Sequence, residues 1–393
     1  MRIFHGLPAA SSRRDCALTI GNFDGVHRGH QALLTRLRAE ASARGLAAVV
    51  CTFEPHPREY FAALAHARAH AGPTGAAPTP TDRRGAARPT RIATLRDKIA
   101  ALADCGIDAV CVLRFDAALA AMPADAFVAR VLAEGLRVRH LLIGDDFRFG
   151  AHRTGDFDLL QALGPRHGFS VERMDTVADS APPADLSVAA EPGAAPPAQA
   201  EPAAGRRISS SALREALAAG DLARARALLG RPYAVTARVL HGRKLGRTLG
   251  FPTLNQRLWR PDAHARLRPA LSGVFAVRVH GLPGAGAAPL AGVASLGTRP
   301  AVERDGAWLL ETHVFDYAHD AYGHCVRVEF VAKLRDEAPF DTLEALAAQI
   351  GRDARAARSL LAAPDDAPPP QPSADARTAV GAARPARHPE PAR

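Results

Sequence analysis

The sequence predicts a doubly wound α/β domain followed by a second domain, an antiparallel β-sandwich or barrel that ends in a helix. Three observations lead to this prediction. The length of 393 residues exceeds what one hydrophobic core usually organises. Strand and helix patterns alternate over residues 17–228, as in a parallel sheet with crossover helices. From residue 231 onward, short β-type runs separated by Gly, Pro and Asp turns replace that rhythm.

The elements of the first block follow from local patterns. The short apolar strand 17–20 ends at Gly21, and apolar residues at helical spacing predict a helix over 31–44, which Gly45 ends. The continuous apolar run 46–53 is typical of a strand buried in a parallel sheet. The same criteria predict a helix at 91–104, a strand at 109–113, a helix at 124–134, a strand at 140–143, and a serine-capped helix at 209–228 broken at Gly220.

The second block contains five predicted strands and one amphipathic helix. The strands span 233–240, 273–279, 291–295, 308–315 and 325–330, and the helix spans 342–357. Segments rich in Ala, Pro and Gly interrupt or follow these blocks, and they bury too little apolar surface to offset the entropy of ordering. We therefore predict domains over 1–230 and 231–363, flexible insertions at about 65–89 and 181–205, and a disordered tail over 364–393.

Composition excludes several classes of protein. With 47% apolar residues the chain is not wholly disordered, and no apolar run approaches the roughly 20 residues that a membrane helix needs. The net charge of +10 is dispersed, which argues against a nucleic-acid partner. Five scattered cysteines without a C-x-x-C pair predict neither disulfides nor a zinc ribbon. We also find no signal peptide, so the expected location is the cytoplasm, with the chain soluble and either a monomer or a weak homo-oligomer.

The most informative stretch is G-N-F-D-G-V-H-R-G-H-Q over residues 21–31. It lies between a strand end and a helix start, where ligand sites of open α/β sheets form, and a helix N-terminus offers N–H groups to phosphate. His27 and His30 are three residues apart, so both can face one bound group. A metal pair and solvent-facing loop histidines are alternative interpretations, but no third metal ligand is suitably spaced.

A second glycine-rich stretch spans residues 242–255, with Gly242, Gly246 and Gly250 at steps of four. It matches neither a Walker A loop nor a G-x-G-x-x-G fingerprint, and a simple hairpin is the alternative interpretation. Thr253 and Asn255 follow it and offer oxygen ligands two residues apart. Such ligands suit Mg²⁺ shared with nucleotide phosphates.

These motifs resemble those of the bifunctional riboflavin kinase/FAD synthetase family of prokaryotes. The first block carries the family's H-x-G-H form in residues 21–30, F-E-P-H-P in 53–57, G-D-D-F-R-F-G in 144–150, and I-S-S-S with Arg214. The second block matches the riboflavin kinase half from residue 242 to about residue 356. This stretch includes the motif L-E-T-H-V-F-D-Y, which begins at Leu310. The resemblance implies a Rossmann-like nucleotidyltransferase domain with a parallel sheet, then an antiparallel riboflavin kinase β-barrel with a terminal helix.

The resemblance also implies roles for single residues of the first block. His27 and His30 would stabilise the ATP phosphates, and the serine run with Arg214 would close over them, although a plain helix cap is the alternative for the serines. The implied nucleotide-binding residues of this block are Gly21, Asn22, Phe23, Asp24, Gly25, Gly29, Ser209, Ser210 and Ser211. The implied flavin-binding residues are Phe53, Pro55, His56, Pro57, Asp146, Phe147, Arg148 and Phe149.

In the second block the resemblance implies that the glycine-rich loop wraps ATP, that Thr253 and Asn255 hold Mg²⁺, and that Glu311 is the catalytic base. Arg299 would contact the flavin. Leu254 replaces the family's usual alanine, and in a strand it should point away from both metal ligands. For Glu311 alone, a cross-strand salt bridge is the alternative interpretation.

The implied enzyme uses Mg²⁺ and ATP to phosphorylate riboflavin to FMN, and then transfers AMP from a second ATP to FMN to give FAD. Riboflavin, FMN and ATP are thus the expected partners. One alternative is an FMN adenylyltransferase with an inactive kinase domain. Another is a non-catalytic flavin- or nucleic-acid-binding module, although the dispersed arginines and few aromatic residues count against it.

Overall fold

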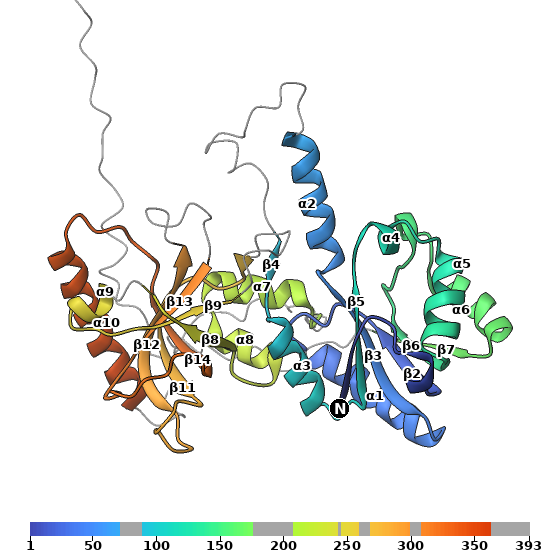
Figure 1. The fold of residues 1–393 in the computed structure, drawn as a ribbon, viewed down its shortest axis with the longest axis horizontal. Coiled ribbons are helices and arrows are strands. Elements are labelled where there is room, and N and C mark those ends of the chain that lie inside the picture. Colours follow the sequence, from blue (N-terminus) through green and yellow to red (C-terminus); the bar gives the residue numbers. More distant parts are fainter. Residues whose placement is uncertain (71–88, 176–206, 243–244, 259–267, 299–307, 363–393) are drawn as a thin grey trace, which may run out of the picture.

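The computed structural model describes residues 1–70, 89–175, 207–242, 245–258, 268–298 and 308–362. It contains an α/β part and a closed antiparallel barrel side by side (Figure 1), which confirms the predicted fold class. The predicted insertion at 181–205 and the tail at 364–393 lie outside the described residues. Of the predicted insertion at 65–89, residues 65–70 are the end of a helix, and 71–88 lie outside the described part.

A six-stranded parallel sheet forms the centre of the α/β part, in the order β1-β5-β3-β2-β6-β7. The predicted inner strands are present and fully or mostly buried, whereas the edge strands β1 and β7 were not predicted because both are short and partly exposed. The strands span Arg2–His5 (β1), Cys16–Ile20 (β2), Ala47–Glu54 (β3), Ala109–Arg114 (β5), Val138–Gly144 (β6) and Ser170–Met174 (β7).

The helices of this part agree with the sequence where an apolar stripe marks them. Gly220 adopts a φ of 76°, which splits the predicted helix 209–228 into two. Helix α2 was missed because its alanines and histidines form no apolar stripe. The helices span Arg28–Ala43 (α1), Pro57–His70 (α2), Leu95–Asp104 (α3), Ala117–Ala120 (α4), Ala124–Ala126 (α5), a π-helical segment Phe127–Gly135, Phe157–Leu163 (α6), Ser210–Ala219 (α7) and Leu222–Leu229 (α8), with 3-10 turns at Ala10–Ser12, Ala151–Arg153 and Gly164–His167.

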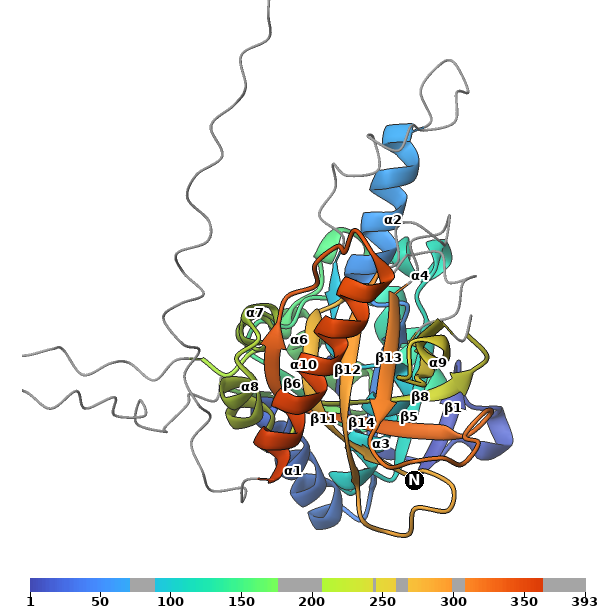
Figure 2. The ribbon, with the colours of Figure 1, turned by 90° about the vertical axis from the view of Figure 1, so that its left-hand side faces the viewer.

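The second part is a closed barrel in the order β11-β12-β13-β9-β8-β14, not a sandwich. Its polar strand β9 escaped prediction; Gln256 of this strand is buried and donates from Nε2 to Ala237 O and Val326 O, 2.9 Å each. Helix α10 (Leu343–Ala362) lies across the barrel (Figure 2). The other elements span Ala234–Leu240 (β8), Leu245–Thr248 (α9), Leu254–Arg257 (β9), Gly273–His280 (β11), Leu290–Thr298 (β12), Trp308–Val314 (β13) and Cys325–Arg335 (β14).

The two parts share a hydrophobic core. Leu213 of α7 and Leu228 of α8 belong to the same buried cluster as the barrel residue Phe275. The short strand β4 (Thr90–Arg91) pairs in parallel with β10 (Arg268–Pro269) across the same boundary. The α/β part and the barrel are thus packed against each other, while the domain limits 1–230 and 231–363 stay a prediction.

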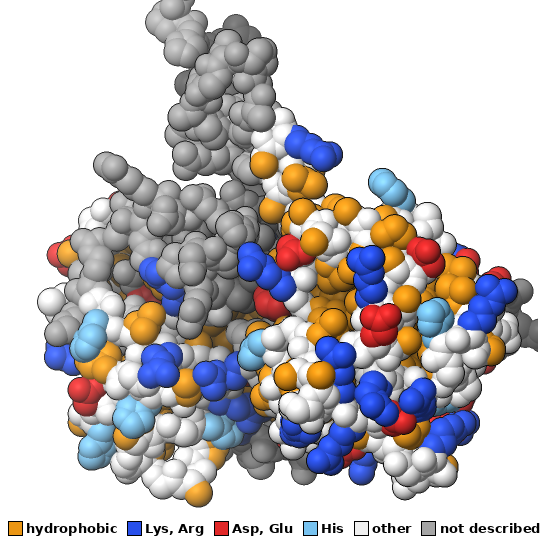
Figure 3. Space-filling view, turned by 45° about the vertical axis from the view of Figure 1, so that its right-hand side comes forward, with side chains coloured by type: hydrophobic (Ala, Val, Ile, Leu, Met, Phe, Trp, Pro, Cys, Tyr) orange, Lys and Arg blue, Asp and Glu red, His pale blue; other side chains and the backbone are white. Residues whose placement is uncertain are grey.

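On the face drawn in Figure 3, Lys and Arg side chains gather over the lower part of the molecule, with scattered Asp, Glu and His side chains among them. Among the helices of the described residues, none has the length and apolar character needed to cross a bilayer.

Candidate active sites

The first candidate site lies at the carboxyl edge of the parallel sheet. The chain runs from β2 outward to β3 and β5 on one side, and then places β6 on the other side of β2. Open α/β sheets bind ligands at such a switch point, outside the carboxyl ends of the strands. The loops after β2, β3 and β6 carry the three predicted motifs at 21–30, 53–57 and 144–150, so the topology brings them to one edge.

The loop after β2 is a tight turn with unusual backbone angles. Phe23, Gly25 and Val26 have φ values of 47°, 87° and 44°, in a region that side chains other than glycine rarely adopt. A Cβ on Gly25 would lie 2.9 Å from Ile92 Cγ2 and 3.0 Å from Leu213 Cδ2. Glycine is therefore required at position 25 for both its angle and its packing.

The two predicted catalytic histidines stack against each other. Their ring centroids are 3.7 Å apart with an interplanar angle of 17°. His27 is the N-cap of α1, and its Nδ1 accepts a hydrogen bond of 3.3 Å from the backbone N–H of His30. A Cβ on Gly29 would lie 3.3 Å from the His27 ring and from Ile208 O, so glycine leaves room for that ring. Since Nδ1 accepts, the neutral His27 ring carries its proton on Nε2, where it can donate to an anion.

Both histidines are neutral at physiological pH. Burial lowers the pKa of His27 to about 4, with Arg214 and Arg207 adding to the effect and Asp24 opposing it. Burial also lowers the pKa of His30 well below its usual range, and His27 contributes further. The pair therefore offers N–H donors rather than fixed charges to a ligand.

Asp24 fixes the turn and anchors Arg214. Its buried carboxylate accepts from the backbone N–H groups of Ile92 and Ala93 at 3.1 to 3.3 Å, and from Arg214 Nη2 at 2.6 Å. Arg214 also donates from Nε to Thr90 O at 3.1 Å. In this structure the Arg214 guanidinium is therefore held against Asp24.

The serine run has three different environments. Ser209 caps α7 by accepting from Ala212 N at 3.2 Å, as the alternative interpretation expects. Ser210 donates from Oγ to Asp24 O at 3.2 Å and so ties α7 to the turn. Ser211 is exposed on α7. The structure thus brings Ser210 and Arg214 to the 21–30 loop, together with the cap serine that starts their helix.

Two residues of the F-E-P-H-P segment, Glu54 and His56, belong to a network of polar and charged side chains that is largely buried. His56 is buried, and its Nε2 lies 2.8 Å from the ammonium of Lys98. Lys98 Nζ also donates to Thr52 Oγ1 at 3.4 Å, and Thr52 donates to Asn22 O at 3.3 Å. Buried Arg91 pairs with Glu54 and Glu59 beside this chain. The network connects the loop after β3 to the loop after β2.

Sequence reasoning missed Lys98, although a signal was present. Lys98, Ala101 and Leu102 are the buried residues of α3, so the lysine occupies an apolar-face position at i, i+3, i+4 spacing. Its side chain is 0% exposed. Lysine is almost never fully buried without a partner, so such a position indicates a specific polar contact.

The position of Lys98 leads to a pH prediction. Burial lowers the pKa of Lys98 from 10.5 to about 8, with Arg91 adding to the effect. The cationic charge is therefore present below pH 8 and is lost as the pH rises through about 8. A reaction of anionic substrates at this site should slow above pH 8, measured as kcat/KM between pH 6 and 9.5. Lys98→Gln should lower the rate and remove this falling limb; an unchanged limb would contradict the role of Lys98.

The segment after β6 places aromatic rings beside the sheet edge. Phe147 and Phe149 stack with centroids 5.6 Å apart, and Phe149 is buried. Arg148 donates to Asp156 Oδ2 at 2.6 Å, and Asp146 accepts from Arg207 Nη2 at 2.8 Å. The two charged residues among the predicted flavin contacts of this segment, Asp146 and Arg148, thus form separate ion pairs in this structure, with Arg207 and Asp156 respectively.

Phe53 belongs to an aromatic cluster that the sequence did not indicate. Its ring lies 5.8 Å edge-on from Phe115, which also contacts Tyr60 and Phe61 of α2. Phe61 is 51% exposed. Pro55 and His56 lie between β3 and α2, and Pro57 is the first residue of α2. The cluster gives the loop after β3 an apolar flank.

The second candidate site lies on the barrel, where the glycine-rich loop meets β9. A Cβ on Gly242 would lie 2.5 to 2.7 Å from the side-chain atoms of Asn255, and one on Gly246 would overlap Phe251 O. Gly250 has a φ of 84°. The three predicted glycines are therefore needed for close packing or for the turn; Arg243 and Lys244 lie outside the described residues.

Thr253 and Asn255 lie side by side, as their spacing predicts. Asn255 Nδ2 donates to Thr253 O at 3.2 Å and to Thr253 Oγ1 at 3.4 Å. Leu254 packs against the barrel core instead, as expected for alternating strand positions. The larger side chain at 254 therefore does not separate the two polar ones.

Glu311 lies opposite these residues in the barrel sheet. It is paired in register with Asn255 of β9 and with Ser295 of β12. A second carboxylate, Glu337, accepts from Ser295 Oγ at 3.0 Å and covers Gly297, where any Cβ would overlap it. Burial raises the pKa of Glu337, and the charge of Glu311 adds to this rise.

Sequence reasoning missed Glu337, which lies in the irregular segment just after β14 rather than at a position of a strand pattern. His313 of E-T-H was also not assigned; its Nδ1–H donates to Pro252 O at 2.8 Å and so holds the loop before Thr253. The predicted flavin contact Arg299 lies outside the described residues.

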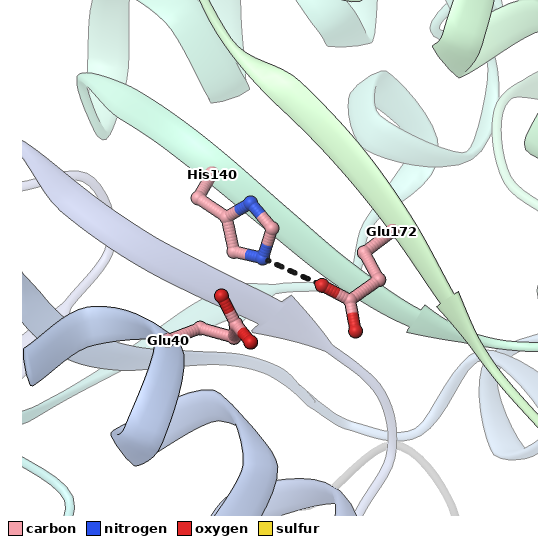
Figure 4. Close-up of side chains that lie close together, drawn as sticks. All are labelled: Glu40, His140 and Glu172. Atoms are coloured by element: carbon pink, nitrogen blue, oxygen red, sulfur yellow. Dashed lines mark ion pairs between the residues drawn. The ribbon is translucent and has the colours of Figure 1, made fainter. Parts of the chain in front are cut away.

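A third cluster of ionisable groups lies away from both sites. Glu40 near the end of α1, His140 early in β6 and Glu172 of β7 offer ligand atoms within 4.8 Å of one another (Figure 4). His140 is 2% exposed, and its Nε2 lies 3.5 Å from Glu172 Oε2. However, Arg36 pairs with both glutamates, and Arg44 pairs with Glu40. The arginines already balance the carboxylates, so we interpret this cluster as a structural ion-pair network.

Comparison with known protein families gives one match for each of the two parts of the chain. Residues 9–183 match the family model described as FAD synthetase, and residues 229–361 match the model described as riboflavin kinase. The first match includes the loops after β2, β3 and β6, and the second includes the glycine-rich loop and Glu311.

Curated relatives match over nearly their whole length. A bifunctional riboflavin kinase/FMN adenylyltransferase of Escherichia coli K12 is 42% identical over 361 residues, covering 92% of this chain and 97% of that protein. Proteins of the same description from Pseudomonas fluorescens and Haemophilus influenzae are 42% and 40% identical. A solved structure described as a macrolide-efflux protein from Streptococcus pneumoniae is similar in fold, with a TM-score of 0.61, 24% identity, and coverage of 90% of this chain and 95% of that one.

Proposed function

This chain belongs to the family of bifunctional riboflavin kinase/FMN adenylyltransferases, and on that premise we propose which of its side chains carry out the two reactions. The chain is a bifunctional enzyme that phosphorylates riboflavin to FMN and adenylylates FMN to FAD. The observation that carries the residue assignment is that the two sets of phosphate-handling side chains lie on separate parts of the fold, one at the sheet edge and one on the barrel.

Adenylyl transfer is assigned to the sheet edge. An oxygen of the FMN phosphate attacks the α-phosphorus of ATP, and the bond to pyrophosphate breaks. The reaction needs positioning and charge stabilisation rather than covalent help from the protein. The stacked neutral imidazoles of His27 and His30 and the start of α1 supply N–H donors to the phosphates. Arg214, held beside them by Asp24, supplies positive charge.

The flavin of this site is assigned to the loops that flank the histidines. The aromatic cluster beside Phe53 offers an apolar surface to the flavin ring system, and Phe147 with Phe149 offers another after β6. The buried Lys98–His56 pair would hold the F-E-P-H-P loop between them in position.

Phosphoryl transfer to riboflavin is assigned to the barrel. The hydroxyl at the end of the ribityl chain attacks the γ-phosphorus of ATP, and ADP leaves. Glu311 takes the hydroxyl proton as general base. Glu337 lies close enough to interact with Glu311 electrostatically, and it binds Ser295, the residue paired in register with Glu311. The turn at Gly246 and Gly250 brings the loop's backbone near the phosphates.

Mg²⁺ is the metal that suits the barrel site. Thr253 Oγ1 and the side chain of Asn255 lie together, and both offer the hard oxygen donors that Mg²⁺ prefers. The lack of a Cβ at Gly242 leaves room around Asn255. When bound together with ATP, Mg²⁺ would neutralise phosphate charge. The role of the protein is to orient Thr253 and Asn255 and to leave Asn255 Oδ1 available while Nδ2 donates to Thr253.

The assignment of Glu311 can be tested by Glu311→Gln. We expect FMN formation to fall roughly 100- to 10,000-fold, the range of general-base contributions, while supplied FMN is still converted to FAD. Product chromatography of the fluorescent flavins measures both steps in one sample. If FMN formation were unchanged, the barrel would be inactive as a kinase, or Glu311 would be only a cross-strand partner.

The alternative function is that of a non-catalytic flavin- or nucleic-acid-binding module. The convergence of His27, His30 and Arg214 at the sheet edge, and of Thr253 and Asn255 on the barrel, favours the enzyme. The cytoplasmic location and the monomeric or weakly self-associating state remain predictions from the sequence.

A further inference from the structure

One arginine from the start of the barrel segment reaches into the turn that precedes the catalytic histidines. Arg231 Nη2 donates to Gly25 O at 2.7 Å, and Nη1 donates to Val26 O at 3.0 Å and to Leu229 O at 3.3 Å. Arg231 lies in the link between α8, which ends at Leu229, and β8, the first barrel strand, which begins at Ala234. Val26 and Gly25 lie 205 and 206 positions from Arg231 in the sequence.

The carbonyls that Arg231 binds belong to the most strained part of the turn. Gly25 and Val26 have φ values of 87° and 44°, and a β-branched residue at positive φ is rare. The positive φ of Val26 is a strained conformation, and it persists only where the surroundings hold it. Gln31 assists by donating from Nε2 to Val26 O at 2.9 Å and to Leu229 O at 2.7 Å.

The direction of these carbonyls matters for an anionic ligand. A trans peptide unit is planar, so the C=O of Val26 and the N–H of His27 point in opposite directions. Because the Val26 carbonyl points toward Arg231, the peptide N–H of His27 points the other way. The carbonyl oxygens of Gly25 and Val26, which carry partial negative charge, are likewise turned away from the start of α1. A phosphate at that helix start would be repelled if the turn relaxed and exposed its carbonyls to it.

We propose that Arg231 is a positioning residue for adenylyl transfer, which holds the 23–27 turn in its phosphate-binding conformation from the kinase side of the molecule. This inference rests on the proposed function of the sheet-edge site. Arg231 acts through the backbone of Gly25 and Val26 and through His27, not by contact with the reacting atoms. The fork of the guanidinium suits two adjacent carbonyls, which a lysine ammonium cannot match.

The residues around Arg231 hold its contact with the 23–27 turn in place, and a space beside it allows the contact to be tested. Tyr233, two residues on, donates from its hydroxyl to Ile92 O at 2.8 Å, so both sides of the contact are anchored. Arg231 and Gly25 also line a cavity of about 340 Å³ between the α/β part and the barrel. Shortening the side chain would enlarge this cavity, so a small guanidinium ion could enter.

The test compares Arg231→Ala, Arg231→Lys and the control Arg226→Ala, an exposed arginine on α8, in the full-length protein. For Arg231→Ala we expect kcat of FAD formation from FMN to fall roughly 10- to 100-fold, the scale of a displaced reactive geometry. The KM for ATP should rise, and FMN formation from riboflavin should stay within about twofold of wild type. Guanidinium chloride at low millimolar concentration should restore part of the lost rate, and methylammonium should not.

Arg231→Lys keeps the charge and should fold even if the alanine variant does not; it should show the same loss to a smaller degree. FAD formation within twofold of wild type in either folded variant would overturn the proposal. A parallel loss of both reactions would also overturn it, because the residue would then be merely structural. If wild-type protein itself made no FAD, the proposed function would fail instead, so the two failures are distinguishable.

Discussion

His30→Ala is expected to abolish FAD formation while FMN formation continues. The ring of His30 stacks on His27 within the turn that starts α1, and no other histidine of the described residues lies in that stack. Removing one donor aimed at developing phosphate charge costs roughly 100- to 1,000-fold in kcat. The barrel site, with Glu311 and Asn255, does not use this side chain. The measurement is chromatography of flavins after incubation with ATP and either riboflavin or FMN.

The matched control is His5→Ala, which removes an exposed histidine from the edge strand β1. Both reactions should proceed normally in this variant. If His30→Ala impaired both reactions equally, the assignment of two separate sites would be wrong. A circular dichroism melt of each variant separates loss of the site from loss of the fold.

Asn255→Ala is expected to have the converse effect. The side chain lies beside Thr253 and is paired in register with Glu311, so its loss removes a proposed metal ligand next to the proposed base. Metal stabilisation of a transferring phosphoryl group is worth several kcal/mol, which corresponds to a loss of roughly 100-fold or more in FMN formation. Supplied FMN should still be converted to FAD at the wild-type rate.

Two further variants serve as controls for Asn255→Ala. Asn255→Asp keeps an oxygen ligand and should retain more kinase activity than Asn255→Ala, with a changed requirement for Mg²⁺. Leu254→Ala should leave the kinase active because Leu254 packs against the barrel core rather than toward Thr253 and Asn255. Full kinase activity in Asn255→Ala would contradict the metal assignment.

The sequence predicts the fold where side-chain patterns are local. The inner strands of the parallel sheet are continuous apolar runs, and Gly220 marks the break between α7 and α8 because a left-handed residue there ends a helix. The edge strands and β9 were not predicted. An edge strand needs no apolar run, and β9 turns the polar Gln256 inward, where two backbone carbonyls satisfy it.

The candidate sites were predictable where residues act close together in sequence. The pairs His27–His30 and Thr253–Asn255 are three and two residues apart, and the structure places each pair in contact. Their partners come from distant segments: Lys98 reaches His56, and Arg231 reaches Gly25. No local pattern encodes such contacts. Of these two residues, only Lys98 is indicated by the sequence, because it is a charged residue on the apolar face of α3.

The most direct test of two sites on one chain is a time course of the purified protein with riboflavin, ATP and Mg²⁺, followed by chromatography of the fluorescent flavins. We predict that FMN appears first and FAD afterwards, and that a parallel sample given FMN makes FAD without delay. FAD from FMN but no product from riboflavin would show a silent kinase. No turnover of either flavin would contradict the account and point to a binding module.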